Sequence, residues 1–204
     1  MRLAVPMLPV DLFRKPIFSL SVATSVCSYA AQSIAYLALP FYFAIGGGMS
    51  QSQIGLLITP WPAVVMIVAP IAGRLSDRYP AGLLGGVGLL GLTLGLVLLN
   101  ALPPDPPFIE VVWRMMIAGI GFGFFQSPNN RALIAAAPRS RSGVASGMLA
   151  TARLTGMTTG GVTVAVIFGL LAGHVGREVT VALGVAAGLS GLGSVISFSR
   201  LGQA

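Results

Sequence analysis

The sequence predicts an all-α integral membrane protein, a bundle of six transmembrane helices. Of its 204 residues, 55% are hydrophobic and 8% are charged, which is too few charges to solvate a globular surface of this size. Six apolar runs are each long enough to cross a hydrocarbon core of roughly 30 Å, which takes about 20 helical residues. The runs are crowded with Gly, Ala and Leu and do not alternate between polar and apolar residues, which argues against a transmembrane β-barrel.

The six predicted spans follow a short lead-in at residues 1–16, where prolines and charged residues interrupt any signal-peptide core. Pro60 and Pro62 predict a kink in the second span, with Trp61 between them as a packing residue. No connection is long enough to hold a soluble domain, so the sequence predicts a single membrane domain over residues 1–204. Its spans cover about 17–43, 53–72, 83–102, 108–128, 143–172 and 179–199.

The net charge of +7 is a topology signal. Most Lys and Arg residues lie on one side of the predicted bundle, namely Arg2, Arg14, Lys15, Arg74, Arg78, Arg131, Arg139, Arg141 and Arg200. The loops on the other side hold only Arg177. Because basic loops stay in the cytoplasm, the sequence predicts a multi-pass protein of the inner (plasma) membrane with both termini cytoplasmic. The expected partner is the lipid bilayer, not a nucleic acid.

The sequence offers little for covalent or metal chemistry. Cys27, the single cysteine, falls within the first span, so neither a disulfide nor a metal site is expected. Nucleotide-binding and nucleophile motifs are absent, so we expect neither an enzyme nor a cofactor. None of the acidic residues lies near the middle of a span, which leaves no convincing proton carrier; they are Asp11, Asp77, Asp105, Glu110 and Glu178.

Glycine pairs four residues apart mark the helix faces that are expected to pack closely. Gly143 and Gly147 form one such pair in the fifth span, and Gly156 and Gly160 form another. Each pair shares one helix face and lets two backbones approach. A second hypothesis stays open, in which the glycine-rich fifth helix slides against a neighbour during a conformational change.

The first span carries a polar stripe at helical spacing, formed by Ser21, Ser25, Ser28, Tyr29, Gln32 and Tyr36. We expect this face to meet water, with Tyr29, Gln32 and Tyr36 lining a substrate path. The alternative is hydrogen bonding between helices in a dry core.

Arg114 and Arg153 lie inside spans, where a guanidinium is energetically expensive. Arg114 follows Glu110 by four residues, which leaves open an interfacial salt bridge or a charged group in the substrate path. Arg153 lies about ten residues into the fifth span, too deep to reach the surface easily, so it should face a wet cavity or a buried acceptor. The candidate partners at the end of the fourth span are Gln126, Asn129 and Asn130, which together with Arg153 are expected to line the substrate path.

The loop after the second span carries a recognisable pattern. Gly73-x-Leu75-x-Asp77-Arg78 resembles the signature loop of the major facilitator superfamily, although Pro80 replaces its second glycine. Residues 9–14, 121–130 and 143–147 resemble that family's fourteen-span drug:proton antiporter branch. Together these stretches resemble its carboxy-terminal six-helix half and cover nearly the whole chain.

The resemblance implies a fold, a role for the loop and a function. Asp77 would latch the outward-facing state, by accepting hydrogen bonds at a neighbouring helix N-terminus, while Arg78 pairs with it or with lipid phosphate; a solvated turn is the alternative. The first helix would line a central cavity suited to amphipathic organic cations. The implied activity is export of amphipathic small molecules or drugs by proton antiport, together with a second six-helix half or as a homodimer. The alternative function is a non-transporting remnant or helical scaffold.

Overall fold

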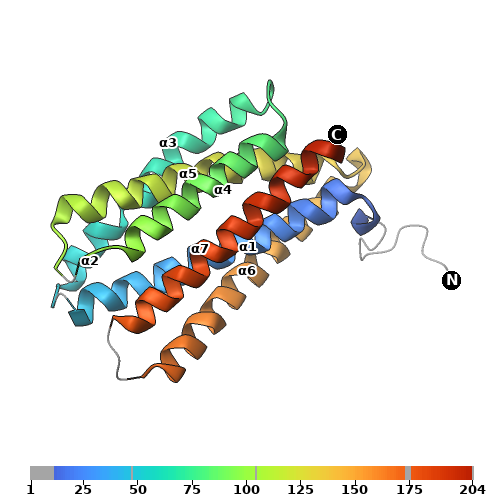
Figure 1. The fold of residues 1–204 in the computed structure, drawn as a ribbon. Coiled ribbons are helices and arrows are strands. Elements are labelled where there is room, and N and C mark those ends of the chain that lie inside the picture. Colours follow the sequence, from blue (N-terminus) through green and yellow to red (C-terminus); the bar gives the residue numbers. More distant parts are fainter. Residues whose placement is uncertain (1–11, 47, 104, 173–175, 204) are drawn as a thin grey trace.

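The computed structural model describes residues 12–46, 48–103, 105–172 and 176–203. Within these ranges there is no strand, and Figure 1 shows long helices running side by side in one bundle. Six helical spans are long and apolar enough to cross a membrane, which confirms the predicted fold class. Most of the predicted lead-in, residues 1–11, lies outside the described residues.

The first two spans are shaped by proline. Helix α1 covers Pro16–Phe41, begins with proline at its first position and passes into a short π-helical segment, Tyr42–Gly46. The second span consists of two helices, α2 at Gln51–Ile58 and α3 at Pro60–Leu75, which meet at Thr59. Proline supplies no backbone N–H to continue the hydrogen-bond ladder, so the predicted kink is a change of helix at Pro60.

The remaining spans are single helices: α4 at Ala81–Asn100, α5 at Phe108–Ala135, α6 at Ser142–Leu170 and α7 at Arg177–Ser199. Helix α5 runs well past residue 128, where the fourth span was expected to end, because Pro128 is accommodated inside the helix. The polar residues that follow are therefore helical and stand beside the loop after α3. A short 3-10 helix, η4 at Arg200–Gln203, follows α7.

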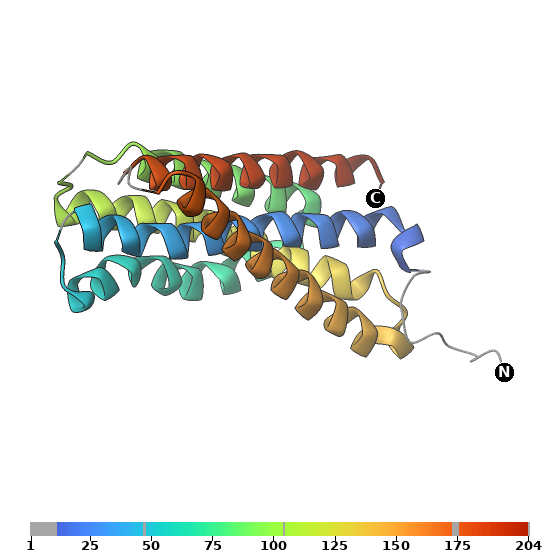
Figure 2. The same ribbon diagram turned by 90° about the horizontal axis from the view of Figure 1, so that it is seen from below.

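The helices pack in the spatial order α3, α5, α4, α7, α1, α6. Figure 1 shows α3 and α6 on opposite sides of the bundle, and Figure 2 shows α6 crossing the other helices obliquely. Helices α3 and α6 do not pack on each other over their described residues. In the apolar windows of the α2–α3 span and of α6, 11% and 17% of residues are buried, against 44–56% in the other spans. The bundle therefore has an open side between α3 and α6, with α1 and α5 between them.

The two helices farthest from this open side are held together by a ladder of serines. Ser190, Ser194 and Ser197 of α7 are buried, and each donates its hydroxyl hydrogen to a backbone carbonyl of α4 at 2.9–3.0 Å. The acceptors are the carbonyl oxygens of Leu89, Gly86 and Gly82. Such bonds join helices in a medium that offers no water.

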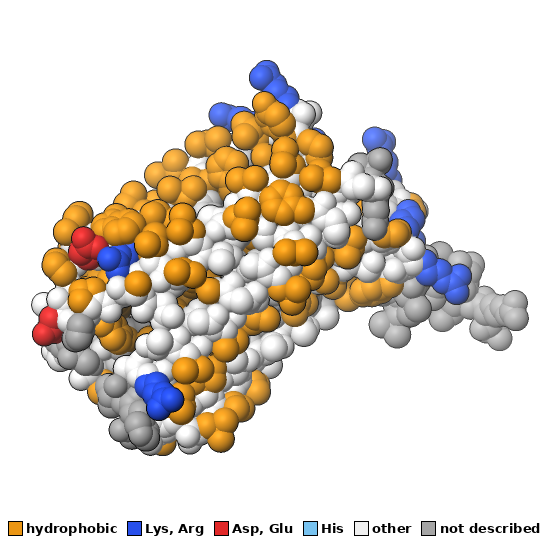
Figure 3. Space-filling view, in the orientation of Figure 1, with side chains coloured by type: hydrophobic (Ala, Val, Ile, Leu, Met, Phe, Trp, Pro, Cys, Tyr) orange, Lys and Arg blue, Asp and Glu red, His pale blue; other side chains and the backbone are white. Residues whose placement is uncertain are grey.

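Most of the basic residues lie at one end of the bundle. At one end α1, α4 and α6 begin and α3, α5 and α7 end; we call this the basic end. Figure 3 shows Lys and Arg side chains gathered there, while the acidic side chains seen in this view lie at the other end, which we call the opposite end, together with further basic side chains.

Candidate functional site

Three polar side chains from three helices converge beside the open side. Gln126 of α5 donates its amide Nε2–H to the Tyr29 hydroxyl of α1 at 3.1 Å. The guanidinium carbon of Arg153, on α6, lies 5.5 Å from the centroid of the Tyr29 ring, within the range of a cation–π contact. The edge of the Phe122 ring packs on Tyr29, with centroids 5.5 Å apart. We call these four residues the Tyr29 cluster.

The position of Arg153 depends on the two glycines that follow it. A Cβ atom at Gly156 would lie 2.7 Å from the carbonyl oxygen of Val26, and one at Gly160 would lie 2.6 Å from that of Ala30. Only glycine lets α6 approach α1 this closely, and this contact brings Arg153 over the Tyr29 ring. Gly143 and Gly147 have the same spacing, but a Cβ at either would meet nothing within 4 Å. Within the described bundle the expectation of close packing at this pair is wrong, because no helix faces them.

The polar face of α1 continues from Tyr29 toward the opposite end. Gln32 and Tyr36 are half-buried, and the Tyr36 ring stacks at a tilt against Trp61 of α3, with centroids 5.1 Å apart. Trp61 is fully buried, and its indole Nε1–H finds no hydrogen-bond partner among the described residues. The wall beside the open side thus combines aromatic rings, amides and one guanidinium.

The serine part of the predicted stripe does not meet water. Ser21, Ser25 and Ser28 are fully buried, because α5 and α7 cover this part of α1. The expectation of a wet face is wrong for these three residues, and the dry-core alternative holds. It is also wrong for Tyr29, of which only 3% is exposed, because Phe122 and Arg153 pack on its ring.

Two of the buried serine hydroxyls, those of Ser21 and Ser25, are hydrogen-bonded to Arg200 and Asn129, which satisfies them without water. Asn129 donates its amide to Ser25 Oγ at 2.8 Å and accepts from Arg200 Nη1 at 2.8 Å. Arg200 also donates to Ser21 Oγ at 2.9 Å and to Ser197 Oγ at 2.5 Å. We call these five residues the Arg200 network; it joins α1, α5 and α7.

Sequence reasoning missed this network. Arg200 was predicted to be one of the basic residues that mark the cytoplasmic side, yet only 4% of it is exposed. Asn129, expected on a substrate path, is fully buried, whereas Asn130, the next residue, is half-buried. A signal was available in the sequence, since an amide inside an apolar span needs a polar partner.

Arg114 lies apart from the Tyr29 cluster, near the opposite end. Its Nη2 pairs with Glu110 at 2.9 Å, and its Nη1 donates to the carbonyl oxygen of Leu98 on α4 at 2.9 Å. Glu110 also accepts from the Trp113 indole N–H at 3.1 Å. These contacts match the salt-bridge alternative and connect Arg114 to α4 and its own helix.

The signature loop is held by an ion pair. Gly73 and Leu75 lie in the last turn of α3, and a Cβ at Gly73 would come 2.9 Å from Ser127 Oγ. Asp77 pairs with Arg131 of α5, while Arg78 is exposed. A helix N-terminus was expected as the partner of Asp77; the partner is a guanidinium instead, because α5 continues beyond residue 128. No group of His, Cys, Asp and Glu residues in the described part of the chain could hold a metal ion.

The fold and the site define a multi-pass α-helical membrane protein with a polar, aromatic wall beside two sparsely packed helices. The chain belongs to the Major Facilitator Superfamily, whose model matches residues 3–161.

Its relatives are named as transporters. It is 51% identical over 194 residues to the uncharacterized transporter YebQ of Escherichia coli strain K12, covering 93% of this chain and 42% of YebQ. It is 31% identical to the riboflavin transporter RibZ of Clostridioides difficile strain 630, covering 71% of this chain and 32% of RibZ. It is also 31% identical to the multidrug resistance protein Stp of Mycobacterium tuberculosis, covering 76% of this chain and 29% of Stp. The chain therefore spans less than half the length of each of these relatives.

Proposed function

We propose that the six helices act as a single membrane domain and form one wall of the path of a secondary transporter, the carboxy-terminal half of a drug:proton antiporter. The transporter would export amphipathic small molecules by proton antiport. The observation that carries this proposal is the convergence of Tyr29, Gln126 and Arg153 beside the open side of the bundle. Polar groups in a membrane span are costly unless they face protein or water, and a translocation path supplies water.

The chemistry of the wall favours a class of substrates. Tyr36, which is half-buried against Trp61, presents aromatic surface, and Gln32 adds an amide that can donate and accept hydrogen bonds. Arg153 is exposed, and no ion pair to it is found among the described residues. A fixed guanidinium favours aromatic substrates with a polar or anionic edge over the organic cations that the resemblance implies. The relatives named for riboflavin and for multidrug resistance are consistent with amphipathic aromatic substrates.

The exposed apolar side chains of the two sparsely packed helices, α3 and α6, favour a second six-helix half as the partner. Met66 and Ile67 on α3 and Leu154 and Val162 on α6 are exposed apolar side chains on helices that contribute little to this bundle's interior. A second six-helix half, or a second copy of the chain, would cover them and close the path. The carboxylate that couples transport to protons would then lie in the partner, because the acidic residues described in this chain lie in loops or in the first turns of α5 and α7.

The test is efflux of a fluorescent aromatic dye from cells lacking their own exporters. The chain is expressed alone and with a second six-helix half, for which the remaining part of YebQ provides a template. We expect efflux with the partner, and an Arg153→Gln change should lower the efflux rate at least fivefold. Asp77→Asn should also lower it, through loss of the Arg131 contact at the loop.

The matched control is Arg139→Gln, which removes one exposed positive charge at the basic end, away from the Tyr29 cluster. All variants are compared at equal amounts in the membrane. Efflux by the chain alone would identify a homodimer. No efflux under any condition would favour the helical scaffold. Equal loss in the Arg153 and Arg139 variants would remove Arg153 from the substrate path.

A separate prediction concerns orientation, with the basic end in the cytoplasm and the protein in the inner membrane. Replacing Cys27, the single cysteine, by alanine allows one new cysteine at exposed Ser140, at the basic end, or at exposed Ser52, at the opposite end. In intact spheroplasts we expect an impermeant maleimide to label Ser52→Cys at least tenfold more than Ser140→Cys. After lysis, both should label equally. The reverse pattern in spheroplasts would place the termini outside.

A further inference from the structure

The basic end of the bundle contains a cavity of about 650 Å³ where four helix ends meet. It lies between the start of α1, the start of α4, the end of α5 and the end of α7. These ends mark the level where an apolar bundle leaves the hydrocarbon core, which is the depth of lipid headgroups. The volume is in the range of small-molecule sites.

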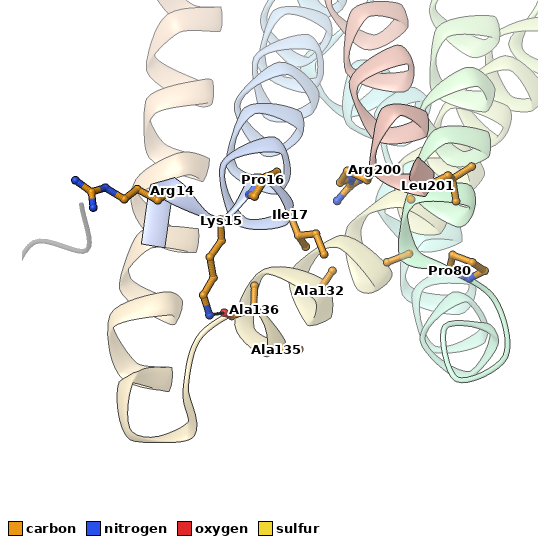
Figure 4. A pocket seen from close by; sticks show the side chains of 12 residues that line it. Arg14, Lys15, Pro16, Ile17, Pro80, Ala132, Ala135, Ala136, Arg200 and Leu201 are labelled. Atoms are coloured by element: carbon orange, nitrogen blue, oxygen red, sulfur yellow. Dashed lines mark hydrogen bonds between the residues drawn. The ribbon is translucent and has the colours of Figure 1, made fainter. Parts of the chain in front are cut away.

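The charges lining this cavity have one sign. Arg14, Lys15 and Arg200 line it, and none of its lining residues is acidic. Figure 4 shows Lys15 directed toward Ala136, whose carbonyl oxygen accepts from its Nζ at 3.0 Å, and Arg14 directed away from the cavity. One hydrogen bond leaves the Lys15 ammonium two further donors.

Arg200 adds a positive charge that nothing in the described part of the chain neutralises. Its hydrogen-bond acceptors are neutral oxygens of Ser21, Asn129 and Ser197. Neutral acceptors satisfy the N–H groups but leave the charge, and the field of a charge is stronger in a low-dielectric site. Two helix N-termini and two C-termini meet here, so their dipoles offset each other, and the side chains decide the sign.

The rest of the cavity wall is apolar. Ile17, Pro80, Ala132 and Leu201 line it together with further alanines. A free phosphate gains nothing from such a wall, whereas a phospholipid places its glycerol and first acyl carbons against apolar surface next to its phosphate. We infer that this cavity binds a phosphate group, and that the ligand is the phosphodiester headgroup of an anionic phospholipid in the leaflet at the basic end.

The test measures lipid binding by the purified full chain in detergent, using native mass spectrometry and the midpoint of thermal unfolding. Phosphatidylglycerol and phosphatidylcholine with identical acyl chains are the probes. We expect phosphatidylglycerol to bind at least fivefold more tightly and to raise the midpoint. Lys15→Gln should weaken its binding about fivefold, the usual effect of one basic side chain on anionic lipid.

Two further variants separate the cavity from general surface charge. Arg139→Gln removes one charge at the same end but outside the cavity, and should change binding less than twofold. Ala132→Phe fills the cavity without changing charge, and should abolish the preference for phosphatidylglycerol. Neither test depends on Arg200, whose replacement is expected to disturb folding.

The outcomes are distinct. Equal binding of the two lipids, or equal loss in the Lys15 and Arg139 variants, would overturn the assignment of the cavity. If inorganic phosphate at the same concentration displaces the lipid and raises the midpoint equally, the phosphate site stands and the lipid assignment falls. None of these results depends on transport activity.

Discussion

Replacing Asn129 by leucine is expected to lower the free energy of unfolding by about 3 kcal/mol. The Asn129 amide bridges α1, α5 and α7, accepting from Arg200 at 2.8 Å and donating to Ser25 at 2.8 Å. Leucine would remove the acceptor and leave a buried guanidinium short of one hydrogen bond, in a place that water reaches poorly. The measurement is unfolding by a denaturing detergent titrated into mild-detergent micelles, followed by circular dichroism.

Two comparisons make this prediction specific to the network. Asn130→Leu changes the same residue type one position along α5, where it is half-buried, and should cost less than about 1 kcal/mol. Combining Asn129→Leu with Arg200→Met removes both the acceptor and the charge, so the double variant should be more stable than Asn129→Leu alone. Strictly additive losses would show that the two side chains are not energetically coupled.

The second large effect is expected at Gly121, where α5 meets α4. A Cβ at Gly121 would lie 2.1 Å from the backbone nitrogen of Leu92 and 2.5 Å from the carbonyl carbon of Gly91. These are backbone atoms and can move only if the two helices separate. We therefore expect Gly121→Ala to destabilise the chain by about 3 kcal/mol, in the same unfolding titration.

Gly184→Ala is the control for this change, because a Cβ at Gly184 meets nothing within 4 Å. Alanine has the higher helix propensity, so this variant should be neutral or stabilised by up to about 1 kcal/mol. Equal destabilisation by the two substitutions would mean that helix separation is not the cause.

The polar pattern of the sequence predicted only part of the Tyr29 cluster. The helical spacing of Tyr29, Gln32 and Tyr36 placed them on one face, and Arg153 was expected to face a wet cavity or a buried acceptor; its contact with the Tyr29 ring was not predicted. Gln126 was named as one candidate partner of Arg153; in the structure it contacts Tyr29, on which Arg153 lies. Spacing describes one helix, but it does not say which helix stands opposite.

The same limit explains the errors. Ser21 and Tyr29 belong to one stripe, and both are buried, because α7 and α5 cover the serine end and Phe122 packs on Tyr29. Only the later part of the stripe, Gln32 and Tyr36, is partly exposed. The glycine pairs at 143 and 147 and at 156 and 160 have identical spacing, but only the second pair faces α1.

The sequence by itself determined the membrane class and the six spans. In hydrocarbon every backbone polar group must be paired within its own helix, so length and apolarity alone mark each span. Only the tertiary structure decided that Arg200 is buried, because its partners Ser21 and Asn129 lie 179 and 71 residues away along the chain. It also decided that α3 and α6 stay sparsely packed and that four helix ends enclose a basic cavity. Such features depend on which helices pack against each other, and the sequence of one helix does not say which helix lies next to it.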